Sequence, residues 1–261
     1  MASAPQPNAL PIFYNSLVPL SSSEHADWKA RSIETAPFLA KQHAVPVTID
    51  EFAIAQRHYP IVFTSGPSPV PIALMGLNEG VNTVVDDAGK PVREAYMPAY
   101  VRRYPFMLVR LNQQSDELSL CFDPTADAIG KFDEGEPLFD AGKPTQATQN
   151  ILGFAEQFEQ AVQRTGAFMK ELLDLKILID GEVSIQQEGN DKPFIYRGFQ
   201  MVSEEKLREL RGDTVRKMVK NGALPLIYAH LFSLSIMREI FGRQAAMGKL
   251  PTQPEMPVPA L

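Results

Sequence analysis

Residues 96–111 read YMPAYVRRYPFMLVRL, and this stretch decides how the chain around it folds. Pro98 suits the first position of a helix, because its fixed backbone angle fits there and its missing N–H is not needed. AYVRRY continues the helix for about two turns, and Pro105 prevents its extension. The apolar run FMLVRL then has the composition of a strand. The stretch therefore predicts a short helix that stops at a proline and passes directly into a strand.

The same order of signals occurs once more upstream, in RHYPIVF at 57–63. Both stretches share the pattern R-x-Y-P followed by apolar residues, which aligns Arg57 and Tyr59 with Arg102 and Tyr104. Each copy predicts a helix end, a proline stop and the first strand of a hairpin. Either an internal duplication or independent use of the same stop signals explains the match.

The flanking sequence predicts further hairpins of antiparallel strands. Thr48 is placed to cap a short helix that runs to about Arg57, with acidic residues in its first turn, and Pro60 ends this helix. Apolar runs separated by short turns then follow, which is the pattern of paired strands. The expected pairs are IVF with VPIALMGL around TSGPSP, VNTVV with PVREAY around DDAGK, and FMLVRL with LSLCFD around NQQSDE.

The second half of the chain is mainly helical in pattern. Apolar residues recur at helical intervals over 146–175, which predicts one long amphipathic helix or two helices broken near Gly166. ILI, EVSIQ and FIYRGFQM then predict short strands, with EGND as a turn. Ser203 and Asp213 are placed to cap the next two helices, and a final helix is expected over about 224–247.

These elements predict an α+β fold. We expect an antiparallel sheet of hairpins in the N-terminal half and centre, a long helix in the middle and a helical C-terminal third. The prolines near both ends predict an extended segment over 1–13 and a Pro-rich tail over 248–261. Residues 14–247 are expected to form a single domain.

The composition limits the classes of partner. Hydrophobic residues make up 44% of the 261 residues, enough for a sizeable core, and 25 Lys plus Arg against 31 Asp plus Glu give a net charge of −6. No basic field is therefore available to hold nucleic acid. The N-terminus lacks the basic start of a secretory signal, and the uncharged stretch 221–237, at ~1.5 Å per residue, is too short for a ~30 Å hydrocarbon core. We expect a cytoplasmic protein without a membrane span, and its oligomeric state stays open.

The sequence predicts neither a metal nor a cofactor. It contains no Walker loop, no GxSxG and no dinucleotide fingerprint, and the acidic, glycine-containing run over 123–142 lacks the ligand pattern of a calcium loop, so we expect a solvated loop there. The single cysteine, Cys121, lies in the alternating run LSLCFD and is expected to be a small buried hydrophobe. The four histidines show none of the short spacings of a metal site: His25, His43, His58 and His230.

His230 and Arg102–Arg103 are the residues with two competing interpretations. His230 and Ser233 can share a helix face, which suits proton transfer, but a hydrogen-bonded histidine at the edge of a core explains them more simply. The two arginines point about 100° apart on a helix, so one can reach inward while the other faces solvent or an acid. They either satisfy carbonyls at the helix C-terminus or form a fork for a carboxylate or phosphate, with Tyr100 and Tyr104 beside it.

Five segments together resemble the SapC family of bacterial proteins, from about residue 14 to residue 240. They are PIALMGLNEGVNTVVDDAGK, YMPAYVRRYPF, LCFD, FIYRGFQMVSEEKL and IYAHLFSL, in this order. One departure is Val92, which stands where the resemblance implies an aromatic residue, often Trp. The same label names an unrelated membrane permease of a peptide transporter, which this chain does not resemble because no membrane span is predicted.

The resemblance implies an accessory role. Family members are often encoded beside TonB-dependent receptors, cupin-like oxygenases and flavin-dependent halogenases, and no catalytic residues carry over. We therefore expect a soluble, non-enzymatic binding protein that acts with an outer-membrane uptake or surface-modification locus and binds a peptide or small anionic ligand. The alternatives are an enzyme, such as a hydrolase or oxygenase partner, that uses His58 or His230, and a surface-layer component. The expected ligand contacts are Arg102, Arg103, Tyr104, Tyr100, Arg57, Tyr59 and His230.

Overall fold

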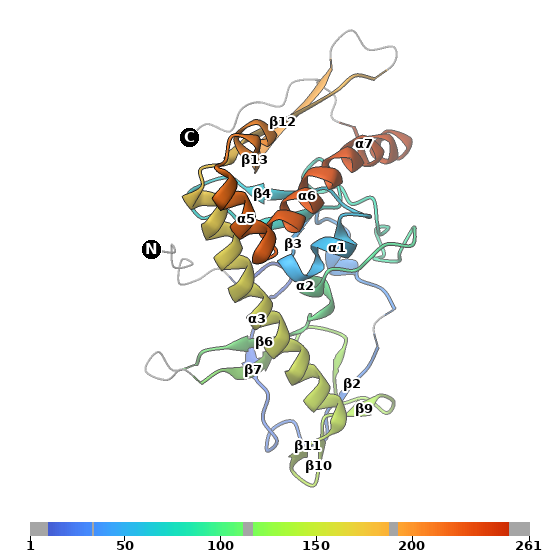
Figure 1. The fold of residues 1–261 in the computed structure, drawn as a ribbon. Helices are drawn as coiled ribbons and strands as arrows, with labels where there is room; N and C mark the ends of the chain where they lie inside the picture. Colours follow the sequence, from blue (N-terminus) through green and yellow to red (C-terminus); the bar gives the residue numbers. More distant parts are fainter. Residues whose placement is uncertain (1–9, 33, 112–116, 188–192, 251–261) are drawn as a thin grey trace.

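The computed structural model describes residues 10–32, 34–111, 117–187 and 193–250. The ends of the chain at 1–9 and 251–261, the turn EGND and most of the turn NQQSDE lie outside the described residues. The described part combines antiparallel sheets, one long helix and a group of C-terminal helices (Figure 1), which confirms the predicted α+β fold.

The largest sheet has five antiparallel strands in the order β12-β13-β4-β5-β3. The predicted hairpin of IVF with VPIALMGL is confirmed, since Ile61 faces Ala73 across β4 and β5. ILI and EVSIQ are not separate short strands, because they join into one eight-residue strand that pairs with β13. The strands are β3 (Ala44–Pro46), β4 (Ile61–Thr64), β5 (Pro71–Leu74), β12 (Leu178–Ile185) and β13 (Phe194–Val202).

VNTVV and PVREAY do not form the full pair of strands that was predicted. Only an isolated bridge between Val85 and Pro91 forms there. The side-chain oxygen of Asn82 accepts hydrogen bonds from the N–H groups of Val84 and Val85, which takes these donors away from a ladder. Pro91 has no N–H to offer in return.

Smaller sheets form the other end of the molecule. FMLVRL and LSLCFD pair as predicted, in the sheet β1-β7-β6. The expectation of a solvated loop over 123–142 is wrong, because its apolar residues form short strands that pack into a second core, with Leu138 fully buried. The strands are β1 (Val18–Pro19), β2 (Lys29–Ala30), β6 (Phe106–Val109), β7 (Ser119–Phe122), β8 (Ile129–Gly130), β9 (Glu136–Pro137), β10 (Phe139–Asp140) and β11 (Lys143–Pro144).

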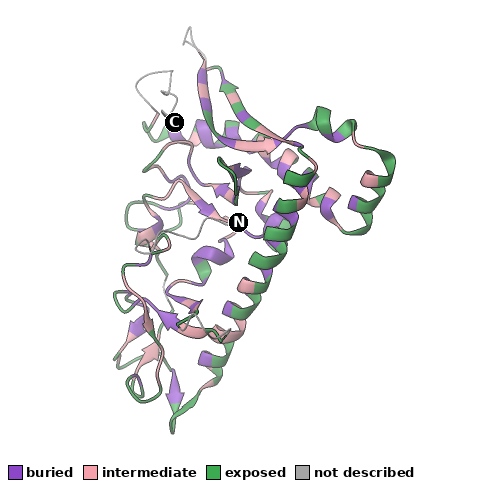
Figure 2. Cartoon of the chain, turned by 90° about the vertical axis from the view of Figure 1, so that its left-hand side faces the viewer, coloured by how far each residue is buried: buried purple, intermediate pink, exposed green. Residues whose placement is uncertain are grey.

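The long helix α3 (Gln146–Asp174) runs through Gly166 without a break, so the one-helix alternative is correct. It extends along both ends of the molecule, and buried and exposed residues alternate along it (Figure 2). Near its start Ile151 packs against the second core, and near its end Leu172 belongs to the main core. α3 therefore connects the two cores.

The other helices are short. α2 forms a single turn rather than two, and Pro98 is its N-cap rather than its first residue. Arg211, not Asp213, occupies the N-cap position of α5; the Asp213 carboxylate instead accepts from the Thr214 N–H inside the first turn. The helices are η1 (Pro37–Leu39), η2 (Ile49–Glu51), α1 (Phe52–Ala55), α2 (Ala99–Arg102), α4 (Glu204–Arg208), α5 (Gly212–Lys220), α6 (Ala223–Ser233), η3 (Leu234–Ile236) and α7 (Met237–Ala246).

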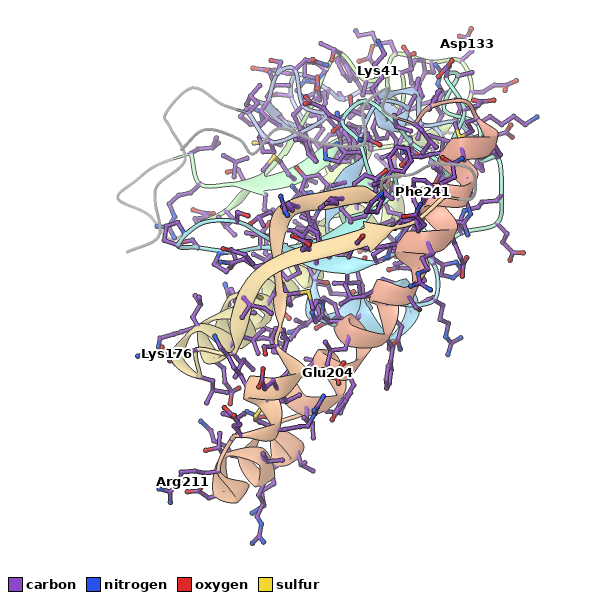
Figure 3. All side chains as sticks on the ribbon, turned by 90° about the horizontal axis from the view of Figure 1, so that it is seen from above. Lys41, Asp133, Lys176, Glu204, Arg211 and Phe241 are labelled. Atoms are coloured by element: carbon purple, nitrogen blue, oxygen red, sulfur yellow. The ribbon has the colours of Figure 1, made fainter. Side chains whose placement is uncertain are left out.

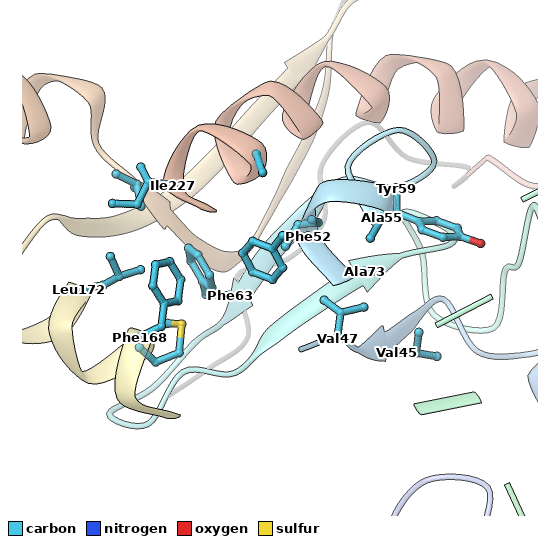
Figure 4. Close-up of a cluster of buried hydrophobic side chains, with 14 of the residues drawn as sticks. Val45, Val47, Phe52, Ala55, Tyr59, Phe63, Ala73, Phe168, Leu172 and Ile227 are labelled. Carbon is cyan, nitrogen blue, oxygen red and sulfur yellow. The ribbon is translucent and has the colours of Figure 1, made fainter. Parts of the chain in front are cut away.

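The main core lies between the five-stranded sheet, α1, α3 and α6. Phe52, Phe63, Phe168, Leu172 and Ile227 meet there from three helices and one strand (Figure 4). Each fully buried large apolar side chain contributes roughly 1.5–3 kcal/mol relative to exposure. This cluster therefore supplies much of the free energy that holds the helices on the sheet.

α7 covers the β12–β13 hairpin. The ring of Phe241 packs 5.0 Å from Phe194 and 6.4 Å from Tyr196, and Figure 3 shows Phe241 on α7 beside the hairpin. By length and composition the run Ala223–Ala246 could cross a membrane, but 44% of its most apolar window is buried inside the molecule. Core helices of this kind pass the same test.

Candidate ligand-binding cavity beside Arg102

A cavity of about 420 Å³ lies beside α2, between segments that are far apart in the sequence. Its volume falls within the ~300–1,000 Å³ typical of small-molecule sites. Three charged residues, Arg31, Glu34 and Arg102, contribute to its lining, and the rest is mainly apolar. The apolar lining includes Ala36, Phe38, Met97, Val101, Phe106 and Ile151.

Arg102 is exposed and is held in place by its neighbours. Its Nε donates to the Met97 carbonyl at 3.0 Å, and one terminal nitrogen donates to the Tyr96 hydroxyl at 3.2 Å. The guanidinium also lies over the Phe154 ring, 5.1 Å from its centre. Among the described residues no carboxylate forms an ion pair with Arg102. Its charge is therefore oriented but not neutralised.

The Arg102 position is connected to a buried carboxylate, Glu51. The Tyr96 hydroxyl, which accepts from Arg102, donates to Glu51 Oε1 at 3.0 Å. The first helical N–H of α2, from Ala99, donates to the same oxygen at 2.6 Å. The other oxygen accepts from the N–H and hydroxyl of Thr48, so both oxygens of Glu51 are fully used. Glu51 thus joins η2 to α2 and sets where Tyr96 presents its hydroxyl.

Arg103 points away from the cavity, in keeping with the angle of about 100° between neighbouring helix positions. It is 8% exposed, and its guanidinium lies 4.5 Å from the Tyr100 ring centre and 4.4 Å from that of Phe158. Its nearest acid is Glu159, at 3.6 Å, where burial raises the pKa of Glu159 and Arg103 opposes this shift. Arg103 is therefore a cation held between aromatic rings under the helix. It does not line the cavity.

Neither arginine forms the expected contacts with carbonyls at the C-terminus of α2 in the described structure. Arg102 reaches back to Met97, which precedes the helix, because the single turn of α2 leaves its side chain closer to the N-terminal end. The prediction that one arginine points inward and one outward is confirmed. Whether either contacts a ligand stays a prediction.

Tyr104 lines the cavity, whereas Tyr100 does not. The Tyr104 ring packs 4.4 Å from Phe38, and burial, with Asp123 and Asp127 adding to it, raises the pKa of Tyr104 to about 12. The Tyr104 hydroxyl is therefore a protonated donor at neutral pH. Tyr100 is buried, and its hydroxyl donates to the Ile12 carbonyl at 3.3 Å.

The upstream R-x-Y-P copy lies away from the cavity lining. Arg57 is exposed, and Tyr59 is fully buried with its hydroxyl donating to the Tyr96 carbonyl at 2.6 Å. Burial raises the pKa of Tyr59 to about 12. The nearby His58 is half-buried, and burial, followed by the charge of Arg93, lowers its pKa. The two copies share their local order of helix end, proline and strand, but only the second one borders the cavity.

His230 lies in the core with both ring nitrogens engaged. Nε2 accepts from the Val202 N–H at 3.0 Å, and Nδ1 donates to the Ile61 carbonyl at 2.6 Å, which fixes the neutral Nδ1–H form. Ser233 donates to the His230 carbonyl and accepts from the Ile61 N–H. His230 thus fastens α6 to β4 and β13, and it does not line the cavity.

The residues that sequence reasoning missed come from 30–38 and from the turn DDAGK. Gly89 has a positive φ of 77°, and a Cβ there would lie 2.1 Å from the Pro37 nitrogen, so only glycine lets this turn close against the cavity wall. The Gly89 carbonyl also accepts from the Ala36 N–H. Val92 is 56% exposed and outside the lining. The glycine was the one available signal, since Arg31 and Glu34 lie in no periodic pattern.

The described part of the chain holds no group of three His, Cys, Asp or Glu side chains placed to bind a metal ion. Cys121 is buried as predicted, and its burial raises the pKa of its thiol.

A family model described as SapC matches residues 20–240, which is most of the chain. No curated protein and no solved structure matches the chain.

Proposed function

The chain belongs to the SapC family, and from this premise we propose that it is a non-enzymatic accessory protein that binds a small anionic molecule or peptide in the cavity beside Arg102. The observation that carries the proposal is an oriented guanidinium that pairs with no carboxylate in the described part of the chain, at the wall of a mainly apolar cavity. An arginine in such a place binds a carboxylate or phosphate through parallel N–H donors.

The surroundings of Arg102 favour binding over holding the fold together. The hydrogen bonds to Met97 and Tyr96 restrict its side chain before a ligand arrives, which lowers the entropy lost on binding. Tyr104 offers a hydroxyl donor in the same lining. An anion with an apolar body therefore suits the site best.

The cavity gives no geometric support to the enzyme alternative. Among the described residues its lining contains no His, Cys, Ser or Lys, and no hydrogen bond joins the Glu34 carboxylate to the hydroxyl of Thr35 or Tyr104. His58 and His230 are both outside it. The further parts of the proposal, a cytoplasmic location and a role beside an outer-membrane uptake or surface-modification locus, rest on the family resemblance alone.

The test is native mass spectrometry of the protein purified from its own host, compared with a denatured spectrum. We expect a mass excess that disappears on denaturation and in the variant Arg102→Gln, with the melting temperature changed by no more than a few degrees because Arg102 is exposed. Arg57→Gln is the matched control, since Arg57 is exposed and outside the lining, and it should keep the mass excess.

An unchanged mass excess in Arg102→Gln would contradict the site. A bare protein mass for the unmodified chain would contradict a tightly held small ligand. Arg103→Gln is not a clean test of binding, because its buried guanidinium packs between Tyr100 and Phe158 and its loss alters the fold.

A further inference from the structure

A second cavity of about 360 Å³ lies next to the first. The two cavities share five lining residues, and the rings of Phe38 and Tyr104, 4.4 Å apart, form part of the wall between them. The hydroxyl of Tyr104 has no hydrogen-bond partner among the described residues. The shared lining residues are Arg31, Glu34, Thr35, Phe38 and Tyr104.

The two cavities differ in charge. Arg102 borders only the first, and Asp127 borders only the second, while Arg31 and Glu34 border both. Arg31 is held much as Arg102 is, since its Nε donates to the Asp127 carbonyl at 2.6 Å and its guanidinium lies 4.1 Å from the Phe132 ring centre. The carboxylates of Glu34 and Asp127 are exposed, and in the described structure neither pairs with a basic side chain. The charged lining of the first cavity, Arg31, Glu34 and Arg102, is therefore net positive, and that of the second, Arg31, Glu34 and Asp127, is net negative.

A purely anionic ligand complements the charge of the first cavity but not that of the second. Its carboxylate would meet Arg102, but the carboxylates of Glu34 and Asp127 would repel any negative charge that reached the second cavity. A ligand with a positive group at its other end meets both. Because Arg102 borders only the first cavity and Asp127 only the second, a ligand that meets both must extend past Phe38 and Tyr104. An extended peptide suits this, since each of its residues adds roughly 3.3–3.6 Å.

We propose that the two cavities together bind a short peptide with free termini, whose terminal carboxylate meets Arg102 and whose terminal ammonium meets Glu34 and Asp127. The proposal rests on the ligand-binding function proposed above and names its ligand class. Apolar side chains of the peptide fill the first cavity, and the hydroxyls of Tyr104 and Thr35 hydrogen-bond its backbone.

The experiment uses the full chain and a mixture of tripeptides made from Ala, Leu and Phe. The mixture is supplied in three forms: with free termini, with an acetylated N-terminus and with an amidated C-terminus. Native mass spectrometry reports which peptides bind. Acetylation should weaken binding about tenfold, as expected for loss of one charge-assisted contact, and amidation should weaken it at least as much.

Two sets of variants assign each terminus. The double variant Glu34→Gln with Asp127→Asn should bind free and acetylated peptides equally, whereas Arg102→Gln should bind free and amidated peptides equally. Glu94→Gln is the control for loss of one negative charge, since Glu94 is exposed and lines neither cavity. All the replaced side chains are exposed, so melting temperatures should stay within a few degrees.

The outcomes separate this inference from the function it rests on. Acetylated peptides that bind as tightly as free ones, with binding still lost in Arg102→Gln, overturn the zwitterionic peptide and leave an anion-binding protein. Absence of binding for all three forms overturns the peptide, while the mass excess of the host-purified protein independently decides the proposed function.

Discussion

The His230 side chain takes the place of a direct backbone hydrogen bond between strands β4 and β13 of the five-stranded sheet. Phe199 faces Thr64 and Gln200 faces Phe63, so in continued register Val202 would face Ile61. The strands instead diverge, and the imidazole of His230 spans the gap, accepting from the Val202 N–H and donating to the Ile61 carbonyl. Only a neutral histidine can do both, because a protonated ring has two donors and no acceptor.

This geometry makes the stability depend on pH. Burial lowers the pKa of His230 to about 4, against about 6.5 in an unfolded chain. Between these values the unfolded state binds more protons, so the free energy of unfolding should rise with pH and reach its full value above about 6.5, a gain of about 3 kcal/mol. Urea titrations between these pH values should show a flatter profile for His230→Asn than for the unmodified protein.

His58→Asn provides the comparison, because His58 is half-buried and, in the described structure, its ring makes no hydrogen bond to a strand of the sheet. It should leave most of the pH dependence in place. If both substitutions flattened the profile equally, the His230 bridge between β4 and β13 would not be the cause of the pH dependence.

The directions of the Arg102 and Arg103 side chains show how much of a side chain's orientation the local sequence predicts. Helical geometry alone predicts that they diverge. Which of the two turns inward depends on Phe158 and Glu159, which contact Arg103 from α3. These residues lie more than fifty positions after Arg103 in the sequence. No local signal contains this information, and the same holds for Arg31 and Glu34 at the cavity.

Elements were easier to predict where the chain carries its own stop signals. Proline and capping residues placed the ends of α1, α2 and α4 to within about a turn, as local rules allow. The failed hairpin of VNTVV shows the limit, since a single side chain, Asn82, diverted the strand's donors. A periodic pattern does not show such competition for backbone N–H groups.

Two glycines should respond in opposite ways to replacement by alanine. Gly166 is exposed in the middle of α3, with open space where a Cβ would lie, so Gly166→Ala should stabilise the protein by about 0.5–1 kcal/mol. At Gly181 a Cβ would lie 2.1 Å from the Phe199 ring, beside the bulge between β12 and β13. Gly181→Ala should therefore destabilise it by at least about 1–3 kcal/mol.

Thermal and urea denaturation of both variants check this prediction. A loss of stability in Gly166→Ala would mean that α3 needs flexibility at that point. Tolerance of Gly181→Ala would mean that the Phe199 ring can move aside without cost.

At the scale of the whole molecule, two cores share one long helix. The main core contains Leu172, and the second core contains Leu138, both fully buried. Sequence patterns identified most apolar elements but not which sheet each would join. Sheet order brings β4 beside β13, and these strands are separated by about half of the chain, so their pairing depends on tertiary contacts that no local pattern contains.

Leu138→Ala should loosen one end of the molecule without unfolding the other. Removing this side chain should cost about 2–5 kcal/mol, and amide exchange should quicken in β2 and β8 while β12 and β13 stay protected. Hydrogen exchange followed by mass spectrometry measures both regions at once.

Leu172→Ala is the matched variant in the main core, and it should quicken exchange in the five-stranded sheet. Uniform acceleration everywhere in both variants would show that α3 couples the two cores into one cooperative unit.

The composition of the cavity lining determines when, during synthesis, the chain can first enclose this cavity. Ala30 and Ile151 both border the cavity, and the latter comes from the start of α3. A ribosome must therefore release the chain well past Ile151 before the walls can meet. A nascent chain that carries Arg102 but lacks α3 would present the arginine without an enclosing wall, so the ligand binding proposed above would have to follow, and could not assist, the early steps of folding.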